Sequence, residues 1–155
     1  MWRVGDRATV RVGAGSRLRM NGEIKADPGA TVIIGERVHV GPWCTFSALE
    51  AVTIGDDCLI AERVSVRDHD HAIETADVPY HARGYVTRPV VIGRNVWIGG
   101  GVTIVKGVSL GDNCVVGANA VVTKSFPPNS LIAGVPARLI RMLDDGEAET
   151  LRRTA

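Results

Sequence analysis

The sequence is poor in aromatic residues, has no long apolar run and shows no excess of either charge. Only 5% of its 155 residues are Phe, Trp or Tyr, so a globule centred on aromatic side chains is not expected. No apolar stretch approaches the length that spans a bilayer, and we expect no membrane span. Eighteen basic residues are balanced by 17 acidic ones, and we therefore expect no nucleic-acid partner.

Cysteine is also scarce, with three residues: Cys44, Cys58 and Cys114. The count is odd, and the first twelve residues carry charges and lack an apolar segment. Together these features predict reduced thiols, no secretory signal and a cytoplasmic location. All three cysteines occupy positions where the repeat described below mostly has Val, so we interpret them as small buried residues. The length predicts one domain over residues 1–155.

Apolar residues recur at every sixth position between residues 90 and 123. A helix would scatter such residues, because six steps of about 100° do not return to one face. A short strand followed by a turn fits, since residues two apart on a strand point the same way. The predicted inward pairs are Val90/Ile92, Val96/Ile98, Val102/Ile104, Val108/Leu110, Cys114/Val116 and Ala120/Val122.

The other residues of each repeat predict a turn. Gly directly follows the aliphatic residue at positions 93, 99, 111 and 117. A Gly or Asn stands three places after the aliphatic residue in five of the repeats. These two residue types accept a positive φ most readily. A chain that bends equally at a fixed interval is a solenoid, and a six-residue period indicates a parallel β-helix. The predicted positive-φ positions are Asn95, Gly101, Gly107, Asn113 and Asn119.

The same register extends upstream to residue 32, with a shift of two residues near positions 49–51. Residues 1–30 fit the register loosely, so we expect atypical N-terminal coils there. If three repeats form one coil, the β-helix contains about five coils. Residues 90–123 are predicted to form the most regular part.

Two segments depart from the repeat. Residues 67–89 have no six-residue period but contain two prolines and three of the four histidines. We expect a long loop there that protrudes between two coils and carries function. After residue 123 the repeat stops and three prolines interrupt regular structure. Residues 141–155 are predicted to form a short helix or a tail.

The strings DHDH, VWIGGG, VVTKSFPPNS and AGVPARLI, together with the repeats, resemble the hexapeptide-repeat acyltransferases. The resemblance covers roughly residues 30–141. Within that family it is closest to the sugar O-acetyltransferases, which include the maltose and galactoside enzymes and the polysaccharide O-acetylases. It implies an all-β fold, the left-handed parallel β-helix, and a homotrimer. It also implies acetyl transfer from acetyl-CoA in a groove between subunits, with no metal.

The resemblance assigns roles to individual residues. The catalytic histidine falls in DHDH, on His69 or alternatively on His71, and would act as general base because imidazole titrates near neutral pH. The backbone N–H of Gly100 corresponds to the donor that stabilises the oxyanion. The positions that match cofactor contacts are Trp97, Gly100, Ala118, Thr123, Lys124, Arg138 and Arg141, and the basic ones would face the phosphates of CoA.

The acceptor side is less closely defined by the resemblance. Ser47 is the nearest position to the acceptor-binding Asn of the maltose and galactoside enzymes, and strand-like residues stand where those enzymes have a helical segment. These departures favour an acceptor other than a simple glycoside. Asp68 and Asp70, also assigned to the substrate side, either orient an imidazole or are solvated loop residues. Trp97 is predicted to point outward, into a groove or a subunit interface.

Three alternatives to a sugar O-acetyltransferase stay open at this point. An N-acetyltransferase acting on an amino sugar would use the same residues. A γ-type carbonic anhydrase, which shares the fold, would use His69, His71 and His81 as zinc ligands. A non-catalytic solenoid would need none of these side chains, and its histidines and basic residues would be solvated surface groups.

Overall fold

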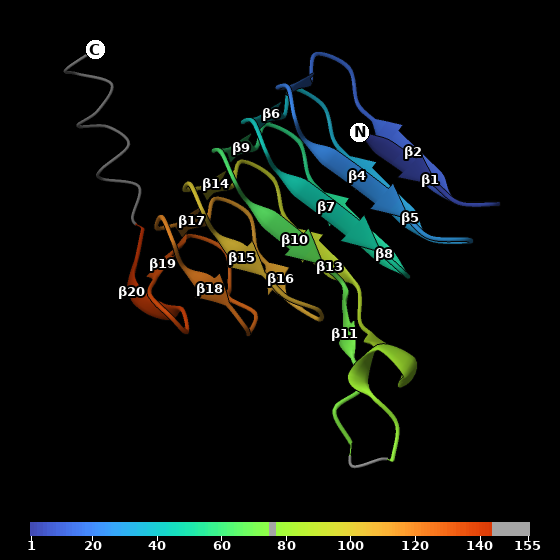
Figure 1. Cartoon of the computed structure of the whole chain (residues 1–155). Coiled ribbons are helices and arrows are strands. Elements are labelled where there is room, and N and C mark those ends of the chain that lie inside the picture. Colours follow the sequence, from blue (N-terminus) through green and yellow to red (C-terminus); the bar gives the residue numbers. More distant parts are fainter. Residues whose placement is uncertain (75–76, 144–155) are drawn as a thin grey trace, which may run out of the picture.

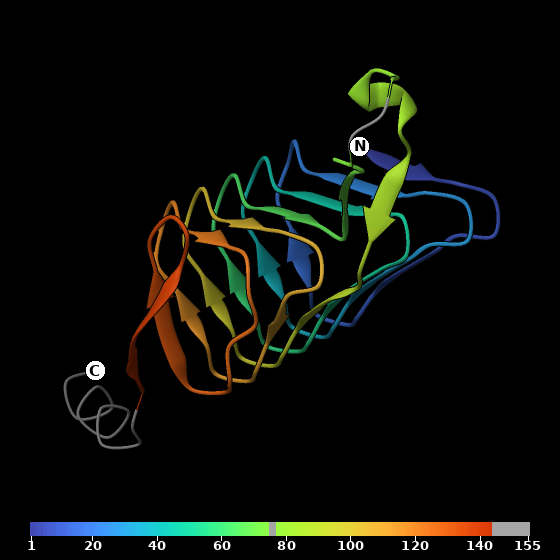
Figure 2. The ribbon, with the colours of Figure 1, turned by 90° about the horizontal axis from the view of Figure 1, so that it is seen from below.

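The computed structural model describes residues 1–74 and 77–143, and its chain winds into a stack of roughly triangular coils (Figures 1 and 2). Strands of successive coils pair in parallel and form three sheets. The fold is all-β, a left-handed parallel β-helix, as the resemblance implied. Within the described residues it has five complete coils and a sixth whose second side is reduced to the bridge between Leu110 and Phe126.

Each complete coil gives one strand to each sheet. Sheet 1 contains β1 (Trp2–Val4), β4 (Glu23–Ala26), β7 (Thr45–Ala48), β10 (Ser65–Arg67), β15 (Thr103–Ile104) and β18 (Val121–Val122). Sheet 2 contains β2 (Thr9–Val12), β5 (Thr31–Ile34), β8 (Ala51–Ile54), β13 (Val90–Ile92) and β16 (Ser109–Leu110). Sheet 3 contains β3 (Arg17–Leu18), β6 (His39–Val40), β9 (Leu59–Ile60), β14 (Trp97–Ile98), β17 (Val115–Val116), β19 (Ser130–Ala133) and β20 (Arg138–Met142). Of these, β20 is an additional antiparallel strand at the end of sheet 3.

The interior of the prism is the apolar core that the six-residue period predicts. All twelve inward residues predicted between positions 90 and 123 are at most 2% exposed. The three cysteines are free and buried in the same core, and burial raises the pKa of each thiol. The interpretation of these cysteines as small core residues is therefore confirmed.

Three rows of turns join the sheets, and we name them by the sheets they connect: corner 1–2, corner 2–3 and corner 3–1. The predicted positive-φ residues lie in these corners, for example Asn95 at φ 52° and Asn113 at φ 60°. Gly93 serves a different purpose, because a Cβ there would lie 2.8 Å from the backbone nitrogen of Asp112. The corner glycines therefore allow successive coils to stack closely.

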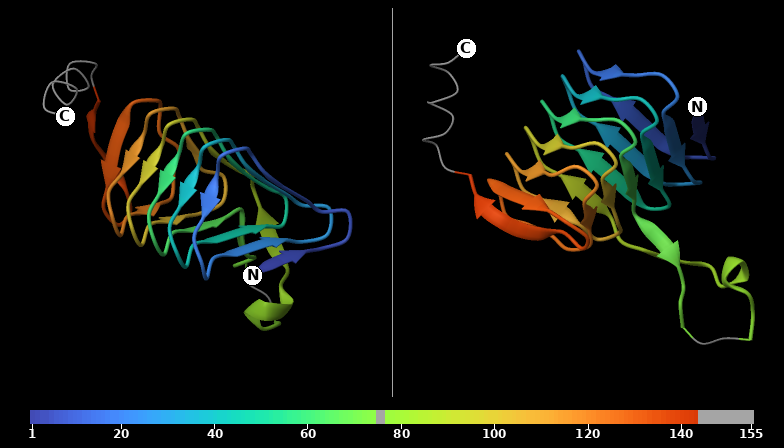
Figure 3. Two further views of the ribbon diagram at one scale, coloured as in Figure 1. Left: turned by 90° about the horizontal axis from the view of Figure 1, so that it is seen from above. Right: turned by 60° about the vertical axis from the view of Figure 1, so that its left-hand side comes forward.

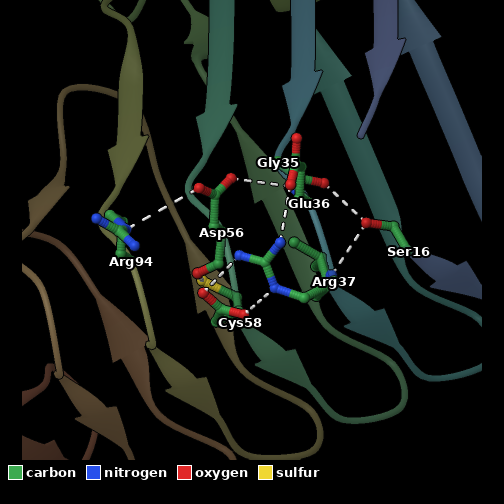
Figure 4. A network of polar contacts seen from close by, with 9 residues as sticks. Ser16, Gly35, Glu36, Arg37, Asp56, Cys58 and Arg94 are labelled. Carbon is green, nitrogen blue, oxygen red and sulfur yellow. Dashed lines mark hydrogen bonds and ion pairs between the residues drawn. The ribbon is translucent and has the colours of Figure 1, made fainter. Parts of the chain in front are cut away.

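Polar contacts link neighbouring coils along corner 2–3 (Figure 4). Arg37 donates to Asp57 of the next coil at 2.6 and 3.0 Å and to Glu36 at 2.8 Å. The hydrogen bond from Arg37 lowers the pKa of the Asp57 carboxyl, and the two carboxylates raise the pKa of Arg37. The Glu36 N–H donates to Asp56 Oδ1 at 2.9 Å, so this corner is held by side chains as well as by the sheets.

The protruding segment is more regular than the long loop expected for residues 67–89. β11 (His69–His71) pairs antiparallel with β12 (Tyr85–Thr87), and a short 3-10 turn, η1 (Tyr80–Ala82), lies between them. This hairpin leaves the stack at corner 1–2 and projects away from the coils (Figures 1 and 3). The antiparallel pairing has no six-residue period, which is why the repeat pattern did not predict it.

The expectation that regular structure ends after residue 123 is wrong. Phe126 is only 7% exposed and closes the second side of the last coil, and β19 extends sheet 3 by a further parallel strand. β20 then pairs antiparallel with β19, so Arg141 lies in a strand rather than in a helix. The three prolines fall between strands, where they remove no ladder hydrogen bond. Residues 144–155, predicted as a helix or tail, lie outside the described residues.

Helical structure is minimal in the parts of the chain that the structure describes. Over residues 1–74 and 77–143, no helix is long and apolar enough to cross a membrane.

Candidate active site

A buried carboxylate forms the base of the hairpin. Asp68 follows β10 directly and has no exposed surface. Its Oδ1 accepts the N–H of Leu49 at 2.9 Å, and its Oδ2 accepts the N–H groups of Glu50 and Ala51, each at 2.7 Å. Only Leu49 and Glu50 separate β7 from β8 at corner 1–2 of the preceding coil. The three N–H groups that hold this carboxylate therefore lie where the repeat shifts by two residues.

The same carboxylate also holds the imidazole of His69. Asp68 Oδ1 lies 2.9 Å from His69 Nδ1, and the His69 side chain is 15% exposed. An ionised Asp68 can only accept, so Nδ1 of a neutral His69 ring would be the donor in this hydrogen bond. Nε2 then presents a lone pair, which is the form that a general base requires.

Tyr85 packs against both histidines of DHDH. Its ring meets His69 edge-on at 5.4 Å between centroids and lies tilted over His71 at 4.3 Å. His71 is exposed and directly opposite Tyr85 in the hairpin. The structure therefore gives His69 a buried polar partner and His71 an aromatic neighbour.

The histidines do not form a metal site in the described residues. His81 is exposed in η1, and no group of three or more His, Cys, Asp or Glu side chains in residues 1–74 and 77–143 is arranged to hold a metal ion. The zinc-ligand set of the carbonic anhydrase alternative is thus not brought together.

Ser47 and Asp70, the residues predicted for the acceptor side, lie beside the hairpin base. Ser47 is opposite Arg67 in sheet 1, and its carbonyl oxygen accepts the Asp68 N–H at 3.3 Å. Asp70 forms an ion pair with Lys106, a residue of corner 1–2 in the next coil. Because side chains alternate along a strand, Asp70 lies on the opposite face of β11 from His69. Asp68 and Asp70 therefore have different environments in spite of their similar positions in the motif.

The predicted thioester-binding residues lie in β14 and in corner 3–1, which follows it. Trp97, at the start of β14, is 53% exposed and points outward as expected. Gly100 accepts the Asn119 N–H at 2.8 Å, whereas its own N–H donates to no group in the described residues. Gly100, Ala118 and Asn119 line a shallow hollow with Glu62. A Cβ at residue 100 would lie 2.7 Å from Glu62 Oε1, so a larger residue there would have to displace the Glu62 carboxylate.

The remaining predicted cofactor residues lie on two further elements. Thr123 and Lys124 are exposed in corner 1–2 of the last coil, two coils beyond Asp68 and hence about 10 Å along the stack. Arg138 and Arg141 are exposed in β20 at the edge of sheet 3. The charged candidates for binding CoA are thus gathered at the C-terminal end of the coil stack.

A single protomer does not bring the two halves of the predicted site together. The Gly101 N–H donates to the Glu62 carbonyl at 2.9 Å. Glu62 precedes β10 and Asp68 follows it, so Gly100 and Gly101 lie at the opposite end of this strand from Asp68. At about 3.3 Å per residue, His69 and Gly100 are roughly 15–20 Å apart across sheet 1. A site that uses both residues would need a second copy of the chain.

Sequence reasoning missed Tyr85, Lys106 and Glu62 as neighbours of the predicted residues. Tyr85 meets the histidines only through antiparallel pairing of β11 with β12. Lys106 and Glu62 lie one coil away from the groups they approach, at separations of 36 and 38 residues. No local pattern in the sequence predicts such neighbours.

Comparison with known proteins agrees with the motifs. A family profile described as the hexapeptide repeat of succinyl-transferase matches residues 31–61 and 89–124. The putative lipopolysaccharide biosynthesis O-acetyl transferase WbbJ of Escherichia coli K12 is 37% identical over 117 residues, 71% of this chain and 60% of its own length. This chain thus spans about three fifths of that relative.

Two further similarities cover more of the matched protein. Nodulation protein L of Rhizobium meliloti is 38% identical over 130 residues, which are 83% of this chain and 68% of that protein. The solved structure of galactoside acetyltransferase in complex with coenzyme A superposes with a TM-score of 0.77 at 34% identity. That superposition covers 89% of this chain and 68% of the other.

Proposed function

Because this chain belongs to the hexapeptide-repeat acyltransferases, we propose that it is an acetyl-CoA-dependent O-acetyltransferase that modifies a sugar or glycoconjugate hydroxyl. The named activity of WbbJ supports an O-acetyl transfer in glycan synthesis, and the coenzyme A complex of galactoside acetyltransferase supports CoA as the carrier. No metal takes part in the proposed reaction. The acceptor is a small hydroxyl-bearing group rather than a nucleic acid.

The proposed reaction is a direct transfer without an acyl-enzyme. His69 Nε2 takes the proton of the acceptor hydroxyl while its oxygen attacks the thioester carbonyl. The N–H of Gly100 stabilises the negative charge on the carbonyl oxygen of the tetrahedral intermediate. The intermediate collapses with cleavage of the C–S bond, and the imidazolium returns the proton to the CoA thiolate. The products are the acetyl ester and free CoA.

One observation carries this proposal: the hydrogen bond between Asp68 and His69, with Asp68 itself held by three backbone N–H groups. It fixes the ring and leaves Nε2 free, as an imidazole base needs. His71 has no comparable carboxylate partner in the described residues, which favours His69. Asp68 would therefore act by positioning His69, and Ser47 and Tyr85 remain to contact the acceptor. Asp70, predicted for the substrate side, faces away from His69 and is paired with Lys106.

We place the active site between two protomers of a homotrimer. The wide separation of His69 and Gly100 within one chain supports this arrangement. If sheet 1 of each protomer faced a common threefold axis, the hairpin of one protomer would approach corner 3–1 of the next. From β7 to β18, one outward row of sheet 1 suits such an interface because it consists of small side chains, and it reaches a charged residue only at Glu23 in β4. The small residues are Thr45, Ser65, Thr103 and Val121.

The cofactor would lie in the groove between these protomers. Trp97 and the backbone at Gly100 and Ala118 would border the thioester. Lys124, Arg138 and Arg141 would face the phosphates, with Thr123 beside them, because fixed positive charges favour phosphate oxygens. Location in the cytoplasm, where acetyl-CoA is made, is part of the same proposal.

Histidine variants test the general base. The assay uses labelled acetyl-CoA and a panel of sugars with free hydroxyl groups and of amino sugars. His69→Ala should lower kcat by about 10²–10⁴-fold, while His71→Ala should retain most activity. Gel filtration and thermal unfolding serve as folding controls for both variants. Full activity of His69→Ala would refute the assignment, and transfer to amines alone would support the N-acetyltransferase alternative.

Subunit complementation tests the shared site. His69→Ala and Gly100→Val should each be inactive alone, and co-expressed they should regain part of the activity. Only a site built from two protomers can combine an intact His69 from one chain with an intact Gly100 from another. Mixed oligomers without any recovered activity, or a monomer by light scattering, would contradict the arrangement.

A further inference from the structure

The first coil leaves its inward side chains uncovered. Trp2 and Val4 occupy the inward positions of β1, yet they are 57% and 50% exposed, whereas Ile24 and Ala26, their partners in β4, are buried. Met20, in the adjacent corner 3–1, is 80% exposed. Behind them an apolar pit reaches into the prism as far as Ile24 and Phe46. This end of the stack, which we call the N-terminal end face, is therefore strongly apolar.

Arginines encircle this apolar end face. Residues 1–22 contain five arginines and one aspartate, a formal charge of +4, whereas the whole chain carries +1. Strands β1, β2 and β3 hold one outward arginine each, and two more lie in the corners. The ring consists of Arg3, Arg7, Arg11, Arg17 and Arg19. The balanced total charge thus hides a local excess at one end of the molecule.

Most of this ring is not neutralised by neighbours. Arg3 pairs with Glu23 at 3.3 Å and Arg7 with Asp6 at 3.5 Å. Arg11, Arg17 and Arg19 form no ion pair with any residue that the structure describes. Three arginines, one on sheet 2, one on sheet 3 and one at corner 3–1, therefore remain available to an anionic partner.

We propose that the N-terminal end face docks on an anionic membrane surface. The combination of exposed Trp and aliphatic side chains with surrounding arginines is the pattern that binds a bilayer interface, with apolar groups below the headgroups and arginines against the phosphates. The contact is peripheral and involves no membrane-spanning element. It would place the enzyme where lipid-linked glycans are exposed.

Two other occupants fit less well. A second copy of this end face would oppose +4 with +4, and the short, arginine-bearing edge strands are of the kind that prevents strand pairing between molecules. Protection of edges explains the arginines of β1, β2 and β3, but not the two corner arginines, Arg7 and Arg19, of which Arg19 lies next to exposed Met20. A soluble acidic glycan would match the arginines but would leave Trp2, Val4 and Met20 in water.

Vesicle sedimentation tests the proposal with the full chain. The protein should bind mixed phosphatidylcholine–phosphatidylglycerol vesicles at low salt and should bind pure phosphatidylcholine much less. Replacing two of the free arginines, in Arg17→Gln/Arg19→Gln, should weaken binding about thirtyfold. The matched control Arg63→Gln/Arg94→Gln removes the same charge elsewhere and should bind as the wild type does. Met20→Ser should also weaken binding while leaving the charge unchanged.

Each of the other outcomes overturns the proposal. Equal binding to both vesicle types, equal losses in the two double variants, or no effect of Met20→Ser would each refute this end-face mode of docking. Tight binding to heparin with no vesicle binding would assign the ring to a soluble polyanion. End-to-end self-association that Met20→Ser abolishes, without vesicle binding, would assign the face to a second copy. Activity on a soluble acceptor should be unchanged in Arg17→Gln/Arg19→Gln, so the test is independent of the proposed reaction.

Discussion

The substitution Asp68→Asn separates the positioning role of this carboxylate from its size. Asn keeps the shape of the side chain but retains one acceptor oxygen and gains an NH₂ group. In the wild type, Oδ1 accepts from Leu49 and His69, and Oδ2 accepts from Glu50 and Ala51. The better amide orientation keeps its oxygen toward residues 50 and 51, because the reverse would leave two N–H groups without an acceptor.

That orientation has two consequences. The Leu49 N–H loses its acceptor in a buried site, which costs about 1–3 kcal/mol of unfolding free energy. The NH₂ group now faces His69 Nδ1 and can only donate to it, so the ring proton moves to Nε2. Nε2, which should take the proton of the acceptor hydroxyl, then already carries a proton. We expect kcat to fall by about 10²–10⁴-fold, well beyond the effect on stability.

The assay combines urea unfolding with the rate of CoA release, followed by thiol titration of the free CoA. Asp56→Asn is the matched control, because Asp56 also accepts a backbone N–H, from Glu36, but lies at corner 2–3 away from the hairpin. One amide oxygen can replace that contact, so its kcat should equal that of the wild type. A folded Asp68→Asn enzyme with wild-type kcat would refute the role of the Asp68–His69 pair.

Three further expectations concern the coil stack. The three buried cysteines, whose thiol pKa values are raised by burial, should react with Ellman's reagent only after unfolding in guanidinium; rapid reaction of the native protein would contradict their burial. Asn95 has φ 52°, so Asn95→Gly should be more stable to urea than Asn95→Ala by about 1 kcal/mol; the usual Ala advantage would refute a positive-φ requirement. Because Arg37 lowers the pKa of Asp57, the Asp57 contribution to stability is present above the unfolded pKa of about 4 and is lost as the pH falls through the lower folded pKa. Urea unfolding of Asp57→Asn should therefore show a weaker acid dependence than the wild type, and identical curves would argue against the ion pair.

The coil core could be predicted from the sequence because its cause is local. A six-residue period fixes which side chains point inward, as for Ile98, and which residues must accept a positive φ, as for Asn95. Both properties depend on neighbours within one repeat. The same reasoning failed after residue 123, because Phe126 and β19 continue the coil with a different spacing.

The site could be predicted only in part, because its contacts join different coils. The DHDH motif indicated two histidines and two aspartates, but their environments differ through partners that lie far away in the sequence. Asp68 is bound by the turn at residues 49–51, and Asp70 by Lys106. Which residues meet across coils depends on where the chain shifts register. The contacts that such a shift produces cannot be predicted until the stacking of the coils is known.

The hairpin has a consequence for how this architecture diversifies. Its entry and exit are joined by the hydrogen bond from the Arg88 N–H to the Asp68 carbonyl at 2.8 Å, and the flanking strands β10 and β13 continue their sheets as though nothing had been inserted. A new excursion at this neck would leave the scaffold untouched. Under the proposed function, one acceptor-binding arm could be exchanged for another at this neck without altering the coils that carry it.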